Sequence, residues 1–416
     1  MSSVVCKRKI LLPQYVNMSK WAVVACDQFT AQPEYWKALD EYVGEAPSTL
    51  RLILPEIYLQ KDNSERVSEI NEMMYKYLGG GVFRSAECFV LTERTMADGG
   101  KRLGLIVTVD LDAYDYHRVR TEIRATEETL PERLPVRIKI RKNAPIELPH
   151  ILLLIDDKKK SVIEPLYQRR NEWKKIYDFD LNMDGGHIVG YQIDQVDDII
   201  ASFDALLDPA LQTEKYGYDA GIELAVGDGN HSMAAAKECW EKIKKRLPEE
   251  KRKDHPARYA LVEVVNLYDE ELVFEPINRV VMGCGQEMIE ELTALLTEQD
   301  GKGQSKVSFL FNGQEKEVFV KETSGRTIQI VQEYLERPEH KKWRIEYVHG
   351  YQHTVDVANA EGGIGIVMPL FEKSELFDYV VNVGNLPKKS FSLGTAESKK
   401  YYIEAKEIKD TSKKRG

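Results

Sequence analysis

The sequence predicts an α/β protein of the α+β kind, with mixed sheets in two domains. The first observation is an alternation of strand-like and helix-like hydrophobic patterns in the second half of the chain, which is typical of an α/β layer. The second is a strand pair at 86–95 and 101–116, joined by the turn ADGGK, where Asp98–Gly99 favours an antiparallel hairpin. The third is length, because 416 residues at roughly 150 per domain give two or three domains.

The first domain is expected to span residues 1–158. Its pattern begins with a short apolar strand that ends in a polar loop, and it closes with a buried strand after a proline-bounded loop. The charged run DDKKKS at 156–161 is the best candidate for an interdomain linker. The expected strands are 20–26, 86–95, 101–116 and 151–155, and the expected helices are 34–42, 65–77 and 133–143.

The second domain is expected to span residues 159–405, followed by a disordered tail at 406–416 whose composition is polar and charged. Two strands, 258–268 and 271–282, are expected to pair around Asp269–Glu270. The expected helices are 162–177, 196–207, 232–245, 286–297, 327–336 and 374–382. The other expected strands are 187–193, 222–226, 306–313, 316–322, 344–352, 363–369 and a Tyr-rich strand from 401.

The acidic composition narrows the class of partner. The chain has 58 Lys and Arg against 68 Asp and Glu, a formal charge of -10 and a pI near 5.5. Nucleic-acid backbones and anionic membranes both favour clustered positive charge. We therefore expect a small-molecule substrate and neither a nucleic acid nor a membrane as partner, and a homo-oligomer stays open.

Cysteine spacing and the N-terminal residues predict a cytoplasmic protein. The five cysteines lie too far apart for a paired metal or redox motif, which indicates reduced thiols. The basic residues 7–9 are followed by an apolar run that stops at Pro13, which is too short for a secretory signal. No apolar run approaches the roughly 18 residues that a membrane span requires.

The most informative segment is AVGDGNHSMA at 225–234. A buried strand ends at Val226, two glycines allow a tight turn, and an Ala-rich helix is expected to begin near Ser232. Backbone amides at such a helix start, together with the helix dipole, form an anion site suited to phosphate. The alternative is a plain capped turn, in which Asp228 or Ser232 only satisfies these amides.

The turn also holds an acid, an amide and an imidazole within four positions. Asp228 can take a proton from an alcohol or hold a magnesium ion, Asn230 can orient a substrate, and His231 can donate to a phosphoryl oxygen. Neither GxGxxG nor the Walker pattern fits, because Ser232 stands where the first needs glycine and no Lys-Ser/Thr follows Gly229. A further hypothesis is that Ser232 is a covalent nucleophile, but no general base lies at a recognisable sequence spacing from it.

These motifs resemble a known family. The stretch VGDGNHSMAAAKECWE looks like the DGHHR-type signature of the bacterial family called domain of unknown function 1015. Further segments that resemble it follow in order along nearly the whole chain: RLGL, ATEET, PIELPHILLLIDD, LVFEPINRVV and LPKKSFSLG.

The resemblance extends to the ParB/sulfiredoxin-like superfamily, whose members bind nucleotide phosphates with the same turn. That superfamily includes nucleotide-hydrolysing partition proteins, sulfiredoxin and an ADP-dependent free-serine kinase. The resemblance therefore implies a nucleotide-binding core, with Gly227, Gly229 and Ser232 at the phosphates and a catalytic role for Asp228. It also implies ATP or ADP, and Mg²⁺ held at Asp228.

The chain departs from the signature at its end. Ser232 stands where the family has arginine, which removes the usual bidentate phosphate contact, and Asn230 stands where it has histidine. Substitutes for the arginine are expected at Arg279, after the strand FEPIN, and in the loop GNLPKKSFSLG. The loop residues concerned are Lys388, Lys389 and Ser390. A further basic stripe, Arg133, Arg137 and Arg141, favours a solvated helix face over a phosphate site.

The resulting hypothesis is a nucleotide-dependent phosphotransferase that acts on a small hydroxylated metabolite, with serine or phosphoserine favoured by analogy with the superfamily's kinase. Asp228 would deprotonate the hydroxyl, and the basic residues with the turn amides would hold the transferring phosphoryl group. A phosphoserine-type phosphatase needs nearly the same residues, and a non-catalytic nucleotide-binding switch is the alternative from another class.

Overall fold

The computed structural model describes residues 3–30, 32–59, 63–117 and 120–409, and the chain divides into two compact units. The first unit comprises Met1–Ala125, Thr129–Leu272 and Ala396–Gly416, and the second comprises Thr126–Glu128 and Val273–Thr395. This division differs from the boundary expected at residue 158. The reason is that a strand at Leu152–Ile155 pairs with one at Leu224–Asp228, so residues on both sides of that boundary share one sheet.

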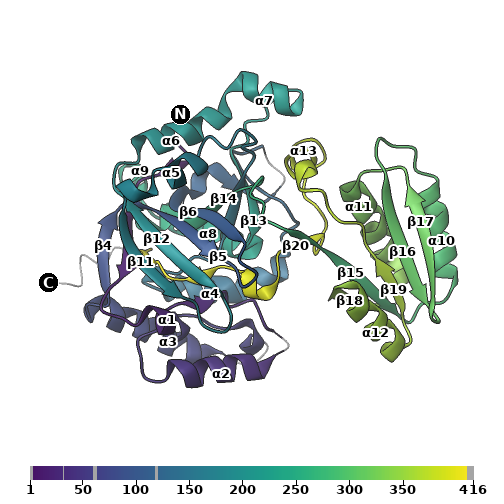
Figure 1. The fold of residues 1–416 in the computed structure, drawn as a ribbon, viewed down its shortest axis with the longest axis horizontal. Helices are drawn as coiled ribbons and strands as arrows, with labels where there is room; N and C mark the ends of the chain where they lie inside the picture. The colour runs from purple at the N-terminus through teal and green to yellow at the C-terminus, as the bar shows by residue number, and fades with distance from the viewer. Residues whose placement is uncertain (1–2, 31, 60–62, 118–119, 410–416) are drawn as a thin grey trace. The chain divides into compact units, whose positions relative to one another are not determined.

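The first unit is built around a mixed sheet, which bears out the predicted fold class. Its strands are β1 (Val5–Cys6), β5 (Phe89–Thr95), β6 (Lys101–Asp110), β7 (Tyr114–Asp115), β8 (Ile123–Ala125), β10 (Leu152–Ile155), β11 (Lys174–Asp180), β12 (His187–Ile193), β13 (Leu224–Asp228) and β14 (Tyr259–Asn266). Within the described residues these ten strands run in the order β11–β12–β5–β6–β14–β10–β13–β8–β7, with β1 beside β6. Figure 1 labels β11, β12, β5, β6, β14 and β13 of this sheet. The predicted hairpin is confirmed, because β5 and β6 pair in antiparallel register.

Short strands and helices complete the first unit. The paired short strands are β2 (Lys9–Pro13) with β4 (Phe83–Glu87), β3 (Val23–Val24) with β21 (Tyr401–Tyr402), and β9 (Ile146–Glu147) with β22 (Lys406–Glu407). The helices are α1 (Met18–Trp21), α2 (Pro33–Val43), α3 (Ser64–Gly79), α4 (Leu134–Asn143), α5 (Glu164–Gln168), α6 (Asp197–Asp204), α7 (Pro209–Tyr216), α8 (Asn230–Lys244) and α9 (Glu249–Arg252). None of these described helices is long and apolar enough to cross a membrane.

Two local expectations are wrong in this unit. The helix expected at 162–177 stops at Gln168, because the alternating sequence KKIYDFD forms β11 and buries Tyr177 against β12. The tail expected to be disordered from residue 406 begins instead with β22, whose Lys406 is buried beside Glu147. Residues 410–416 lie outside the described residues.

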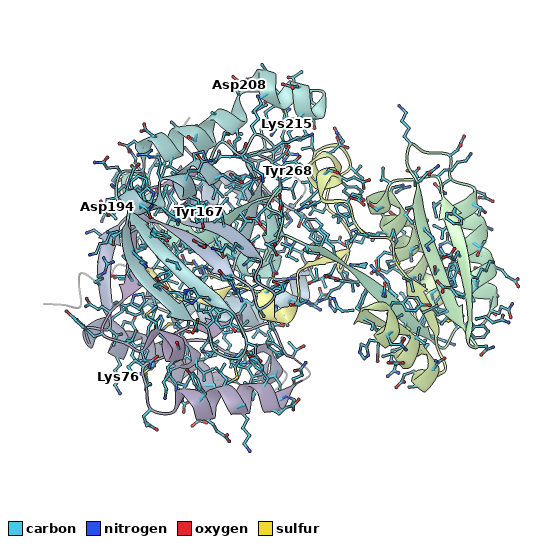
Figure 2. The ribbon with its side chains drawn as sticks, in the orientation of Figure 1. Lys76, Tyr167, Asp194, Asp208, Lys215 and Tyr268 are labelled. Atoms are coloured by element: carbon cyan, nitrogen blue, oxygen red, sulfur yellow. The ribbon has the colours of Figure 1, made fainter. Side chains whose placement is uncertain are left out.

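The charged run at 156–161 is a fixed turn rather than a linker. The carboxylate of Asp157 accepts the backbone amides of Ser161 and Val162, at 2.5 and 2.9 Å. Asp156 is held by Lys215 of α7 at 3.3 Å and by the Tyr268 hydroxyl at 2.9 Å. Figure 2 labels Lys215 and Tyr268. The charges that suggested a flexible connection therefore anchor α7 to the sheet.

The second unit has a sheet of its own. Its strands are β15 (Phe274–Met282), β16 (Ser305–Phe311), β17 (Gln314–Val320), β18 (Arg344–His349), β19 (Ile364–Val367) and β20 (Phe391–Leu393). Its helices are α10 (Glu287–Thr297), α11 (Ser324–Leu335), α12 (Tyr351–Glu361) and α13 (Leu376–Asn382). The pairing expected between 258–268 and 271–282 does not form, because β14 pairs with β6 and β10 while β15 pairs with β18, β19 and β20.

The packing of β13 and α8 places the predicted signature turn. β13 lies between β10 and β8, and its residues up to Val226 are buried in the main core. The alanines at the start of α8 let α4 approach closely, so that Leu134 and Ile138 pack on Ala234 and Ala235. The turn between β13 and α8 is therefore held by a buried strand on one side and a packed helix on the other.

Candidate active site at the turn between β13 and α8

Gly229 makes the turn possible. It adopts a left-handed conformation, with φ of 85°, and a Cβ at this position would lie 3.1 Å from Cα of Ile151. Helix α8 begins directly after it at Asn230, two residues earlier than the expected start near Ser232. No side chain caps the helix start among the described residues, so the amides of its first turn have no helical or side-chain-cap acceptor. This corner has the backbone geometry that binds anions.

Asp228 closes β13 and forms an ion pair with Lys399. Its Oδ1 accepts the amide of Gly229 at 2.8 Å, and its Oδ2 accepts Nζ of Lys399 at 2.9 Å. The side chains of Asp228 and Lys399 are 28% and 11% exposed. Desolvation raises the pKa of the carboxyl, but the Lys399 ammonium outweighs that effect and holds the pKa of Asp228 below its usual value. The carboxylate is therefore ionised at neutral pH.

The position of Lys399 is fixed by buried arginines of the central sheet. Arg94 of β5 donates to the carbonyl oxygens of Ser398, at 3.1 Å, and of Lys399. Arg102 of β6 also donates to the Ser398 oxygen, at 3.2 Å. Sequence reasoning missed Lys399, which lies 171 residues from Asp228 and in no recognised motif. It supplies a cation beside the turn in which the signature arginine is replaced by Ser232.

Ser232 takes part in a second group that the sequence did not reveal. Its hydroxyl lies 3.1 Å from Nε2 of His150, and Nδ1 of the same imidazole lies 2.9 Å from the hydroxyl of Tyr402. The Tyr402 oxygen also accepts the backbone amide of Cys26 at 3.2 Å. Burial raises the pKa of Tyr402 well above its usual value, so the phenol keeps its proton. The only sequence signal for His150 is its place in the proline-bounded loop before β10.

The other two polar residues of the turn have restricted roles. Nε2 of His231 accepts the backbone amide of Leu130 at 3.2 Å, so this nitrogen cannot be the predicted donor to a phosphoryl oxygen in this arrangement. Asn230 Oδ1 is buried and has no hydrogen-bond partner among the described residues. An amide with an unused oxygen remains suited to orient a ligand, as predicted for Asn230.

The basic residues predicted from the loop and strand of the second unit lie in different surroundings from those expected. Arg279 was expected to point toward a cleft, but it is fully buried, donates to the Ile277 carbonyl and to Gln332, and lies over the Tyr347 ring. The physical reason is that its strand, β15, is an inner strand that pairs on both sides. As placed, its guanidinium is used inside the unit.

The loop residues of the second unit differ among themselves. Lys388 forms an ion pair with Glu336 at 2.8 Å. Ser390 is buried, and its hydroxyl donates to the Pro387 carbonyl at 2.7 Å, which makes it part of the turn. Lys389 is exposed and has a left-handed backbone, with φ of 59°. Of the three, Lys389 alone is both exposed and without a described ion pair.

A pocket of about 150 Å³ opens beside Ser232 and His150. Its lining is mainly aliphatic and includes Tyr402 and Cys26 as well as two arginines of α4. Arg137 pairs with Glu56, and Arg141 pairs with Glu147 at 2.5 Å. The Arg stripe was expected to be a solvated face, but these two side chains are only 19% and 15% exposed.

The magnesium expectation can be tested against the donor set. Among the described residues there is no group of three or more His, Cys, Asp or Glu side chains that could hold a metal ion. Asp228 is thus a single carboxylate, already paired with Lys399. It fits a magnesium ion only where phosphate oxygens and water supply the other ligands, which is the usual case at nucleotide sites.

The chain belongs to the family described as "Protein of unknown function (DUF1015)", whose model matches residues 9–355. Among solved structures, it is similar to free serine kinase in complex with AMP, at 11% identity and a TM-score of 0.39, over 73% of this chain and 92% of that chain. A mutant of that kinase in complex with ADP has 11% identity and a TM-score of 0.40, over the same 73% and 92%. A conserved hypothetical protein from Pyrococcus furiosus has 13% identity and a TM-score of 0.34, over 72% and 90%. No curated protein matches.

Proposed function

We propose that this member of the DUF1015 family is a nucleotide-dependent phosphotransferase that acts on a small hydroxylated metabolite. The observation that carries the proposal is the ion pair of Asp228 and Lys399 at the uncapped start of α8. It puts an ionised carboxylate, a cation and backbone amides at one corner. These are the groups that phosphoryl transfer needs, since its catalysis consists mostly of positioning and charge stabilisation.

We infer from the ion pair that substrate binding activates Asp228 as the base. A carboxylate with a lowered pKa is a weak base, so Asp228 paired with Lys399 is poorly suited to accept a hydroxyl proton. When a phosphate enters, Lys399 exchanges its carboxylate partner for phosphoryl oxygens, and the pKa of Asp228 rises. Asp228 then takes the hydroxyl proton while the substrate oxygen bonds to phosphorus and the bond from phosphorus to the leaving oxygen breaks.

The remaining groups have assigned roles in the same scheme. The amides at the start of α8 and Lys399 contact the oxygens of the transferring group, which partly replaces the missing signature arginine. Asn230 orients the acceptor. A magnesium ion, when bound, would supply further positive charge at the phosphates; if Asp228 held that ion, it would position the metal instead of taking the hydroxyl proton. ATP or ADP is the proposed donor, with serine or phosphoserine as the favoured hydroxylated partner.

The test is a phosphorus NMR assay of the purified full chain. The protein is incubated with magnesium and ATP or ADP, together with hydroxy amino acids or their phosphates, and the phosphorus signals are followed. We expect Asp228→Asn to abolish turnover while nucleotide affinity, measured by calorimetry, is kept. The matched control is Asp198→Asn, because Asp198 is an exposed acid on α6.

The same assay separates the alternatives. Release of inorganic phosphate from phosphoserine without nucleotide would identify the phosphatase. Nucleotide binding without consumption of any donor across the panel would contradict the phosphotransferase and favour the switch protein. Equal turnover by the parent protein and Asp228→Asn would remove the carboxylate from the mechanism.

A further inference from the structure

Ser232, His150 and Tyr402 form a continuous hydrogen-bonded chain that ends at a pocket. The serine hydroxyl contacts one imidazole nitrogen at 3.1 Å, and the tyrosine hydroxyl contacts the other at 2.9 Å. All three side chains line the pocket of about 150 Å³. A nucleophile, a base and a group that orients the base are the three parts of nucleophilic catalysis. We propose that Ser232 is a nucleophile that attacks small carboxylic esters with an apolar acyl chain.

The surroundings of the imidazole hold it in place and are compatible with the tautomer that the reaction needs. His150 packs edge-on against the Tyr402 ring, with ring centroids 5.8 Å apart and planes at 89°. Tyr402 is 2% exposed, and its oxygen already accepts the Cys26 amide, so the phenol is held in place. When Nδ1 of His150 donates its proton to the Tyr402 oxygen, Nε2 is left as an acceptor for the serine proton.

The pocket indicates the class of substrate. Its wall beside Ser232 includes Leu52, Leu54, Ile140, Ile151 and Leu261. Both arginines in its described lining are ion-paired, to Glu56 and Glu147, which leaves the pocket poorly suited to a phosphate or a carboxylate. An apolar cavity of about 150 Å³ is large enough to hold benzene, so the acyl chain has about six non-hydrogen atoms or fewer.

The proposed reaction balances as an ester hydrolysis. Ser232 Oγ bonds to the acyl carbon, its proton passes to His150 Nε2, and the bond from the acyl carbon to the alcohol oxygen breaks as that oxygen takes the proton. Water then attacks the acyl-serine, gives a proton to His150, and releases the acid as the proton returns to Ser232. The amide of Ser232, in the first turn of α8, lacks a helical acceptor and stabilises the oxyanion.

The first experiment uses the full chain without nucleotide, so that its result does not depend on phosphotransfer. Hydrolysis of p-nitrophenyl butyrate is followed, and a fluorophosphonate probe is added and the labelled peptide identified. We expect a burst of nitrophenol, labelling of Ser232, and a rate that falls by about 10³-fold in Ser232→Ala. His150→Gln should lower the rate by about 10²–10⁴-fold. Ser202→Ala and His353→Gln, both on helix surfaces, are the controls.

A second measurement separates activation from structural support. Ser232→Cys introduces a thiol whose alkylation by iodoacetamide reports the basicity of its neighbour. We expect alkylation of Ser232→Cys to slow at least tenfold when His150→Gln is added, with unchanged circular dichroism. Equal alkylation rates, labelling at another residue, or full ester hydrolysis by Ser232→Ala would overturn the proposal. Equal hydrolysis of a decanoate ester would overturn the assignment of the pocket.

Discussion

Lys399 and Lys400 are neighbours in the sequence, but they belong to two different kinds of ion pair. Lys399 contacts Asp228 at the turn, where the two side chains are 11% and 28% exposed. Lys400 lies in the interior, 3.4 Å from Glu263 and 3.9 Å from Glu404, with side-chain exposures of 4%, 7% and 0%. Under the proposed function, the comparison separates a pair that exchanges partners with a ligand from a cluster that only maintains the fold.

The interior cluster is more deeply buried than the pair at the turn, and Oε2 of Glu404 has no hydrogen-bond partner among the described residues. Glu263 also accepts the Thr92 hydroxyl at 3.2 Å, and Glu404 accepts the Tyr177 hydroxyl at 2.5 Å. Desolvation raises the pKa of Glu263, but Lys400 and nearby arginines outweigh it and lower that pKa overall. Water cannot replace a partner in such a place, so removal of one charge leaves another buried and uncompensated.

The strongest test of the comparison is therefore Lys400→Met. We expect the free energy of unfolding to fall by about 3–5 kcal/mol, because the carboxylates of Glu263 and Glu404 lose their buried cation. Urea denaturation followed by circular dichroism measures the change. Lys159→Met, at an exposed position, is the control and should change stability by less than about 0.5 kcal/mol. A loss below about 1 kcal/mol for Lys400→Met would show that the cluster is hydrated.

Glu223 extends the comparison to a buried acid whose carboxyl group has no hydrogen-bond partner among the described residues. It is 1% exposed, and neither carboxylate oxygen has a hydrogen-bond partner among the described residues. Burial, and then the nearby carboxylates of Asp204 and Glu122, raise the pKa of Glu223 from 4.5 to about 8. The folded state therefore holds this acid neutral at pH 7, whereas the unfolded chain ionises it.

We expect Glu223→Gln to stabilise the protein on the order of 3 kcal/mol at pH 7. The gain in stability should be absent below pH 4.5, grow as pH rises from 4.5 to about 8, and stay constant above that range. The reason is that an acid with a raised pKa in the folded state destabilises the protein only where the unfolded chain is ionised. Denaturation curves at several pH values measure it, with Glu214→Gln on the surface as control. A gain that does not depend on pH would mean that Glu223 has an unseen partner.

Lys399→Gln should separate function from stability. We expect a stability loss of at most about 1 kcal/mol, because the pair is partly hydrated. Under the proposed function, phosphoryl transfer should fall by about 10²–10³-fold, since a group that stabilises the transferring phosphoryl oxygens is lost. The two measurements are denaturation and the phosphorus assay. A large stability loss with unchanged turnover would place Lys399 with Lys400 as a structural residue.

The smallest expected effect is on the stability of the protein at acid pH. Lys399 lowers the pKa of Asp228 in the folded state. The ion pair therefore stabilises the protein at pH values above the pKa of the unfolded chain, and this stabilisation is lost as pH falls through the folded pKa, in the range below about 4. We expect Asp228→Asn to remove this part of the acid dependence and to cost less than about 1 kcal/mol near neutrality. Melting temperatures from pH 2.5 to 7 measure it. Parallel curves for the two proteins would contradict the lowered pKa.

Local sequence patterns were sufficient to predict the turn between β13 and α8, but not the residues that contact it from elsewhere in the chain. The buried run before Gly227, the glycines and the following alanines indicate a strand, a tight turn and a packed helix, and the structure has β13 and α8 there. His150 lies 82 residues from Ser232, and Tyr402 lies 252 residues from His150, so their contacts depend on sheet pairing. No spacing rule connects such positions.

The domain division failed for a related physical reason. A charged run such as 156–161 is expected to separate domains, but Asp157 uses its charge to hold backbone amides of the next turn. The mixed sheet class was predictable from hydrophobic alternation, whereas strand order was not, because β10 and β14 are parallel neighbours separated by more than a hundred residues. The basic residues of 384–394 were expected at a phosphate because of their glycine- and proline-bounded loop and the family resemblance, and neither shows which side chains are already paired.

The interruption of the first unit by Val273–Thr395 has a consequence for how the protein is made. Because Lys399 follows Asp228 by 171 residues, a ribosome that has finished β13 and α8 must still translate Val273–Thr395 before the carboxylate meets its cation. During that interval the nascent first unit also lacks β21 and the interior lysine, Lys400. The turn between β13 and α8 therefore lacks its lysine until Val273–Thr395 has been translated.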